Sequence, residues 1–101
     1  MGKVEYCLNI IKTQGEIVVA VCDAELLGKV FREGELKLEV KETFYGTKKV
    51  NSETAIKALK EATIGNLIGE RIIKRAIEES LLGQNCIIKI NGIPHAQFIR
   101  L

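Results

Sequence analysis

Residues 17–22 (IVVAVC) form an unbroken run of apolar side chains near the start of the chain. The run is far shorter than the roughly 20 apolar residues that cross a membrane. A short run this rich in valine is typical of a strand that is covered on both faces. Residues 4–10, which begin with Val4, alternate apolar and other side chains as a half-buried strand does, and residues 12–15 (KTQG) supply a turn. We therefore predict a hairpin whose second strand, residues 16–23, is central in a sheet.

The segment after this hairpin has the signals of a short helical turn and a further strand. Asp23 can accept hydrogen bonds from the free N–H groups of the turn, and Gly28 can end it in the left-handed conformation. Residues 30–34 (VFREG) are expected to form a loop. In residues 35–41 (ELKLEVK), apolar side chains alternate with charged ones, which predicts a strand with one face in water. Residues 42–50 (ETFYGTKKV) are expected to form another turn region.

Two segments have helical patterns. Ser52 is a suitable N-cap for a helix over residues 53–62. In residues 68–83 (IGERIIKRAIEESLLG), pairs of apolar or small residues alternate with charged pairs every four residues, which places one stripe on the core. Gly83 is expected to end this second helix. The two helices could be separate or continuous through the intervening ATIGN segment, whose glycine weakens a helix interior by about 1 kcal/mol.

The dipeptide Asn91-Gly92 is the strongest short-range hairpin signal in the chain. It supplies the positive φ angles that a two-residue type I′ turn needs between the segments CIIKI and IPHAQFIRL. In the register set by this turn, Lys89 lies opposite Pro94. Because proline has no N–H to donate, we expect the last strand to lie at a sheet edge or to begin irregularly.

Strands, two helices and a final hairpin together indicate an α+β fold. We predict a mostly antiparallel sheet of about five strands with two helices packed on one face. The chain of 101 residues has the usual length of a single domain, so we expect residues 1–101 to form one domain.

The composition is that of an ordinary globular protein. The 15 basic and 13 acidic side chains give a net charge of +2, whereas a dedicated duplex-DNA binder concentrates its cations more strongly. Cys7, Cys22 and Cys86 are far apart and lack the spacing of metal ligands, so we expect reduced thiols and no bound metal or cofactor. Lys3 and Glu5 stand where a secretory signal would have its apolar core, and no segment approaches a membrane span. These features predict a cytoplasmic protein without membrane contact.

Three segments in order also carry a resemblance: CDAELLGKVFREGELKLEV, EATIGNLIGERI and NGIPHAQFIRL. Together they resemble a family of short archaeal proteins that is classed as a domain of unknown function. The resemblance covers nearly the whole chain and implies an archaeal, cytoplasmic, stand-alone protein. The family has a loose association with translation-related genes. The resemblance implies no reaction, cofactor or catalytic residue.

The best candidate for a binding surface is the turn FYGTKK, which places Tyr45 beside Lys48 and Lys49. Proteins often hold single-stranded nucleic acid by stacking bases on exposed rings and by pairing cations with the backbone. In an earlier loop, Lys29 and Arg32 could grip a phosphate or a carboxylate. We therefore expect a small non-enzymatic binding protein whose partner is RNA or a ribonucleoprotein.

His95 is the only histidine, and the hairpin register places it opposite Ile88 on an apolar face. One interpretation is a histidine at the margin of the core, hydrogen-bonded to a carbonyl or to Gln97. The alternative is an enzyme or a small-anion site, in which His95 lies at the mouth of a pocket and Arg32 clamps the anion. No nucleophile or metal motif accompanies the histidine at a recognisable spacing, so the sequence favours binding and assigns no catalytic residue. A third hypothesis is a homodimer in which the edge strand 95–100 pairs with its counterpart.

Overall fold

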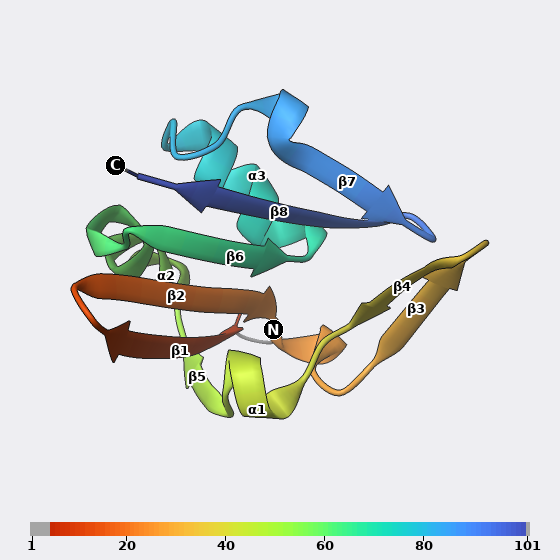
Figure 1. The fold of residues 1–101 in the computed structure, drawn as a ribbon, viewed down its shortest axis with the longest axis horizontal. Helices are drawn as coiled ribbons and strands as arrows, with labels where there is room; N and C mark the ends of the chain where they lie inside the picture. Colours follow the sequence, from red (N-terminus) through yellow and green to blue (C-terminus); the bar gives the residue numbers. More distant parts are fainter. Residues whose placement is uncertain (1–4, 101) are drawn as a thin grey trace.

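The computed structural model describes residues 5–100, and Figure 1 shows their fold. Val4, with which the first predicted strand begins, lies outside the described residues. The elements in chain order are β1 (Tyr6–Thr13), β2 (Glu16–Asp23), the 3-10 turn η1 (Ala24–Leu26), β3 (Val30–Glu33), β4 (Leu36–Glu39), α1 (Glu42–Tyr45), β5 (Lys48–Val50), α2 (Ser52–Glu61), β6 (Ile64–Ile68), α3 (Glu70–Glu78), the 3-10 turn η2 (Gln84–Cys86), β7 (Ile87–Ile90) and β8 (Ile93–Ile99).

Six strands form one sheet in the order β5-β1-β2-β6-β8-β7, and β3 and β4 form a separate two-stranded sheet. Every neighbouring pair in the large sheet is antiparallel except β2 and β6, which are parallel. Helices α2 and α3 lie together on one face of this sheet, behind it in Figure 1. The predicted α+β class, the mostly antiparallel sheet and the two helices on one face are confirmed. The main sheet has six strands rather than about five.

Strand β2 is central, as its apolar run predicts. Its side chains from Val19 to Cys22 are fully buried because both faces of the strand are covered. On the first face, Val19 and Val21 pack with residues of α2 and α3, including Leu59 and Ile72. The burial of this strand on two sides explains why its sequence is apolar without alternation.

The second face of the sheet is covered only in part. At one end, Cys7 and Cys22 pack with Val40 and Tyr45 in a second apolar cluster, beside α1 and the β3–β4 hairpin. Figure 1 shows these two elements together on one side of the molecule, away from α2 and α3. Strand β1 is therefore covered on both faces at its start, and Cys7 is fully buried where the alternating pattern predicted a half-buried strand.

Strand β6 is the main element that the sequence patterns did not reveal. Its segment was assigned to the two helices or the link between them, but it forms a strand between β2 and β8. Gly65 in this strand packs against the ring of Phe98, which occupies the space that a side chain at Gly65 would need. The parallel pairing with β2 joins residues almost 50 positions apart, so no local pattern reports it.

The segments around β3 and β4 also differ from expectation. Residues 30–34 were predicted to be a loop, but β3 takes up most of them and pairs with β4. The strand predicted at residues 35–41 exists, but it belongs to this separate hairpin and not to the main sheet. The turn region at residues 42–50 contains the short helix α1 and the edge strand β5.

The helix ends differ from the prediction in two details. The side chain of Asn51, not Ser52, caps α2 by accepting a hydrogen bond of 2.9 Å from the backbone N–H of Thr54. Helix α3 ends at Glu78, before Gly83, because Ser80 takes the left-handed conformation with φ of 60°. The chain therefore leaves the helix one turn earlier than the glycine indicates.

The C-terminal hairpin forms with the predicted register. Ile90 pairs with Ile93 and Lys89 with Pro94, and the turn residues Asn91 and Gly92 both have positive φ. The edge position predicted for the last strand is wrong, because β8 lies between β6 and β7. Pro94 is tolerated there because the β7–β8 pair does not need its N–H, and on the other side the β6–β8 ladder ends at the pair Ile68–His95.

Candidate functional site

The ring predicted to stack on a nucleic acid base is not accessible. Tyr45 is only 4% exposed and lies in the second apolar cluster, with its ring edge-on to Phe44 at a centroid distance of 5.1 Å. Burial raises the pKa of its hydroxyl. The prediction of Tyr45 as a binding residue is therefore wrong, because the short helix α1 turns the side chain into the core.

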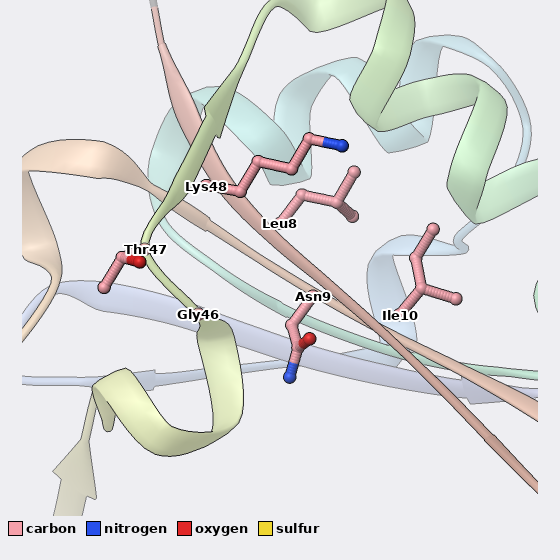
Figure 2. A pocket seen from close by; sticks show the side chains of 6 residues that line it. All are labelled: Leu8, Asn9, Ile10, Gly46, Thr47 and Lys48. Atoms are coloured by element: carbon pink, nitrogen blue, oxygen red, sulfur yellow. The ribbon is translucent and has the colours of Figure 1, made fainter.

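Lys48 and Lys49 are exposed on the edge strand β5, where successive side chains point to opposite sides. Lys48 lines a cavity of about 260 Å³ together with residues of β1 and the α1–β5 connection, as Figure 2 shows. Its other lining residues are Leu8, Asn9, Ile10, Gly46 and Thr47. In Figure 2 the lysine extends over Leu8, whereas the amide of Asn9 points away and donates a hydrogen bond of 2.9 Å to the carbonyl of Phe44. This cavity offers one cation and no ring, so it lacks the parts of a base-stacking site.

Lys49 lines a different cavity, of about 270 Å³, on the opposite side of β5. The charged side chains beside it include Glu25 and Arg71, which pair with each other. The two lysines therefore do not form one cationic surface. Lys29 and Arg32 are both exposed, and Arg32 lies opposite Lys37 in the separate β3–β4 hairpin.

His95 is partly buried on β8, the strand next to the edge strand of the main sheet, between Ile68 of β6 and Ile88 of β7. Burial lowers the pKa of its ring below the ordinary 6.5, which favours the neutral imidazole. Arg32, the proposed anion clamp, belongs to the other sheet. The structure thus brings His95 into register with two isoleucines and with no charged residue.

The sequence reasoning missed a charge cluster at the start of α3, in which Asp23 is buried and its charged partners are partly exposed. The carboxylate of Asp23 accepts hydrogen bonds of 3.0 Å from the backbone N–H groups of Arg71 and Ile72, so it caps α3 and not the adjacent turn η1. Gly69 makes room for this carboxylate, because a side chain at that position would overlap it. Burial raises the pKa of Asp23, and the two backbone bonds and the charge of Arg71 offset part of that rise. Gly65 and Gly69, which lie four residues apart before α3, therefore both allow close packing.

The guanidinium of Arg71 completes this cluster. It pairs with both carboxylate oxygens of Glu25, donates to the carbonyl of Glu5 at 3.1 Å and lies 5.6 Å from the centre of the Tyr6 ring. The hydrogen bonds from Arg71 lower the pKa of Glu25. Because Arg71 is engaged by Glu25, by the carbonyl of Glu5 and by the nearby Asp23, the cluster joins α3 to the end of β2 and its guanidinium is committed to these partners.

An apolar groove lies between α3 and β7 and has a volume of about 420 Å³. Apolar side chains from both elements and from the start of β8 line it, and charged side chains of both signs stand around them. The apolar residues are Ile73, Ile77, Ile87 and Pro94, and the polar ones are Glu70, Lys74, Glu78, Gln84 and Lys89. None of the residues singled out as binding candidates from the sequence lines this groove. The pattern that could have revealed it is the apolar stripe of α3 beside a proline-containing hairpin.

The groove runs along an open edge of the sheet, since β7 is the outermost strand on that side. Ile90 and Ile93 flank the two-residue turn and so exchange hydrogen bonds, which leaves the N–H and C=O groups of Lys89 and the C=O of Ile87 directed away from β8. The N–H of Ile87 is already bonded to the carbonyl of Gln84. The side chains of Ile87 and Lys89 point to the groove. Unpaired backbone groups and an apolar groove therefore lie side by side.

The fold and this groove define the chain as a small α+β protein with an open sheet edge beside an apolar groove. The chain belongs to the family described as "Protein of unknown function (DUF424)", whose model matches residues 11–101. This confirms the resemblance seen in the sequence. No helix among residues 5–100 has both the length and the apolar character needed to span a bilayer.

A solved structure has the same fold. The crystal structure of an uncharacterized conserved protein from the archaeon Methanopyrus kandleri is 27% identical in sequence, with a TM-score of 0.78. The match covers 96% of this chain and 94% of the other. No curated protein matches this chain.

Proposed function

We propose that the chain is a small non-enzymatic binding protein that holds an extended segment of a partner polypeptide as an added strand beside β7. The observation that carries this proposal is the apolar groove next to the unpaired backbone groups of Ile87 and Lys89. Adding a strand to an exposed edge is a common mode of peptide recognition, in which backbone hydrogen bonds supply affinity and pockets for alternate side chains supply specificity.

The geometry defines the chemistry of the partner segment. Every second side chain of an added strand would enter the groove and contact Ile73, Ile77 and Pro94, so these positions favour branched apolar residues. The side chains between them would lie beside Ile88, which is 60% exposed. The groove has both acidic and basic residues around it, so a segment with charges of both signs at its ends fits better than a highly charged one.

Strand addition at this edge can be tested at Lys89, because its backbone N–H points away from β8. Lys89→Pro removes that donor without removing a hydrogen bond of the β7–β8 pair, whereas Lys89→Ala removes only the side chain. The probe is a fluorescein-labelled synthetic peptide that alternates valine with threonine and has one lysine and one glutamate at its ends. Its binding is measured by fluorescence anisotropy, and melting curves verify that both variants are folded.

We expect the unmodified protein and Lys89→Ala to bind this peptide, and Lys89→Pro to bind at least about tenfold more weakly, a loss of about 1.4 kcal/mol. Ile77→Glu, which places a charge in the groove, should weaken binding similarly, while Lys57→Glu on the exposed side of α2 should not. No binding up to about 1 mM peptide, the range of a 4 kcal/mol interaction, would refute the proposal. Equal binding by the alanine and proline variants would also refute it.

RNA as the partner stays a prediction that rests on Lys48, Lys49, Lys29 and Arg32, without the ring of Tyr45. A titration with single-stranded RNA at low and high salt tests it separately, because phosphate contacts weaken steeply as salt rises. Salt-dependent binding that is lost in a Lys48→Ala, Lys49→Ala double variant would favour RNA over the polypeptide partner. Binding of the peptide with no salt-dependent RNA binding would favour the polypeptide.

A further inference from the structure

Part of the second sheet face carries a row of aliphatic side chains that neither apolar cluster includes. The cross-strand registers place one residue from each of four neighbouring strands in this row. The aliphatic row consists of Ile11 (β1), Val18 (β2), Ile64 (β6) and Ile99 (β8). Three of them are partly buried by their neighbours in the sheet, and Ile99 is 62% exposed. They pack with neither the helices of the first face nor the elements that cover the other end of the second face.

Figure 1 shows why this row is open. The β3–β4 hairpin, η1 and α1 lie at one end of the sheet, where β1 begins and β8 begins. At the other end, near the β1–β2 turn and the end of β8, no described helix or strand lies over the second face. The aliphatic row is at this uncovered end, since its residues come from the later part of β1 and β8 and the early part of β2 and β6.

The neighbouring row has three amide side chains and one alanine and carries no charge. This row crosses the same four strands two residues closer to the covered end. Its members are Asn9, Ala20, Asn66 and Gln97. Each amide side chain has both hydrogen-bond donors and acceptors. Beyond the aliphatic row, the first charge in register on this face is Glu16, opposite Thr13 beside the β1–β2 turn. Across both rows the face therefore combines apolar contact with amides and has no ionic group.

These properties indicate which partner fits. A nucleic acid would need cations on this face, and the two rows have none. A symmetric contact places each patch against an identical one, so a charged patch would repel itself, whereas a neutral patch of aliphatic and amide groups is complementary to its own copy. Two sheets can also pack face to face with their aliphatic side chains interdigitated.

We propose that two copies of the chain associate through this face, with the aliphatic row of one copy packed against that of the other. The two rows span four strand spacings and two residue repeats, or roughly 250 Å² in projection. A standard interface takes about 800 Å² per partner, so this contact is expected to be weak and reversible. It differs from the dimer predicted from the sequence, because it uses the face of β8 and not a hydrogen-bonding edge.

Sedimentation velocity at concentrations from about 10 µM to about 1 mM, the range of weak association, tests the proposal. We expect the weight-average sedimentation coefficient of the unmodified protein to rise with concentration. Ile99→Glu should abolish that rise, because two carboxylates would meet in the contact. Ile10→Glu is the matched control, since Ile10 is also an exposed isoleucine, 47% exposed, but lies on the other face of the same sheet.

A monomer at every concentration would overturn the proposal. So would association that Ile99→Glu leaves unchanged, or association that both glutamate variants abolish equally. Lys89→Pro, which tests peptide binding at the open edge of β7, should leave self-association intact. Each of the two proposals can therefore be refuted without refuting the other. Association that only the Lys89→Pro variant removes would assign the contact to the open edge of β7 and refute the face-to-face arrangement.

Discussion

Replacing Asp23 by alanine tests how α3 is held in place. This carboxylate is only 3% exposed, and it accepts the two backbone hydrogen bonds from Arg71 and Ile72 that begin the helix. Because Gly69 precedes the helix, no side chain at the cap position can replace it. Asp23→Ala would therefore leave two N–H groups without partners at a site that water reaches poorly. Since α3 forms one wall of the apolar groove beside β7, the same change would also make the position of that wall less well defined.

The expected cost follows from these contacts. A side-chain cap at a helix N-terminus is worth about 1–2 kcal/mol, and a hydrogen bond to a charged acceptor about 1.5–3 kcal/mol. The cost of burying a carboxylate, which is also why burial raises the pKa of Asp23, offsets part of that gain. We expect Asp23→Ala to lower the free energy of unfolding by about 2–3 kcal/mol, or the melting temperature by roughly 10–15 °C.

Urea denaturation followed by circular dichroism measures this change, with two variants for comparison. Asp23→Asn retains one oxygen that can accept a bond and removes the buried charge, so it should cost less than half as much as the alanine variant. Glu25→Gln weakens only an exposed ion pair with Arg71 and should cost at most about 1 kcal/mol. A loss below about 0.5 kcal/mol for Asp23→Ala, or equal losses for all three, would refute the assignment of Asp23 as the cap.

Three further outcomes are expected from single side chains. Burial lowers the pKa of His95, so as the pH falls the imidazole binds a proton in the unfolded chain at a higher pH than in the folded protein. The folded protein therefore loses stability as the pH falls below about 6.5. His95→Gln should show a smaller drop in urea midpoint between about pH 7.5 and pH 5. Equal drops in the two proteins would contradict this. A thiol-reactive dye should label the exposed Cys86 rapidly in the folded protein and the other cysteines only in denaturant, because burial raises the pKa of Cys22 to about 12. Rapid labelling of more than one thiol per folded chain would count against this burial. Gly65→Ala should destabilise the protein by about 1–3 kcal/mol in the same urea assay, since the new methyl group would displace the Phe98 ring, and an unchanged midpoint would show that the ring moves freely.

Interactions between neighbours in the chain made several elements predictable. The positive φ angles at Asn91 and Gly92 set the last hairpin and its register before any tertiary contact is considered. The four-residue alternation in α3 reports its buried face because it follows the helical period, and the unbroken apolar run in β2 reports a strand covered on both faces. For these elements the physical cause lies within a few residues, and their prediction was accurate.

The candidate site was less predictable, because its surfaces depend on which segments meet. The local turn sequence predicts an exposed ring at Tyr45, but the short helix α1 turns this side chain into the core. The groove beside β7 needs α3 and the last hairpin to lie together, which neither segment encodes by itself.

By itself, the sequence determined the α+β class, the central apolar strand and the final hairpin, since these follow from local periodicity and turn chemistry, and the resemblance of three segments indicated the family. Only the tertiary structure decided that β6 is a strand, that Asp23 caps a helix almost 50 residues later and that β7 forms the open edge. The reason is physical. Strand pairing, helix capping across the fold and the choice of edge depend on contacts between distant segments, and those contacts exist only once the chain has folded.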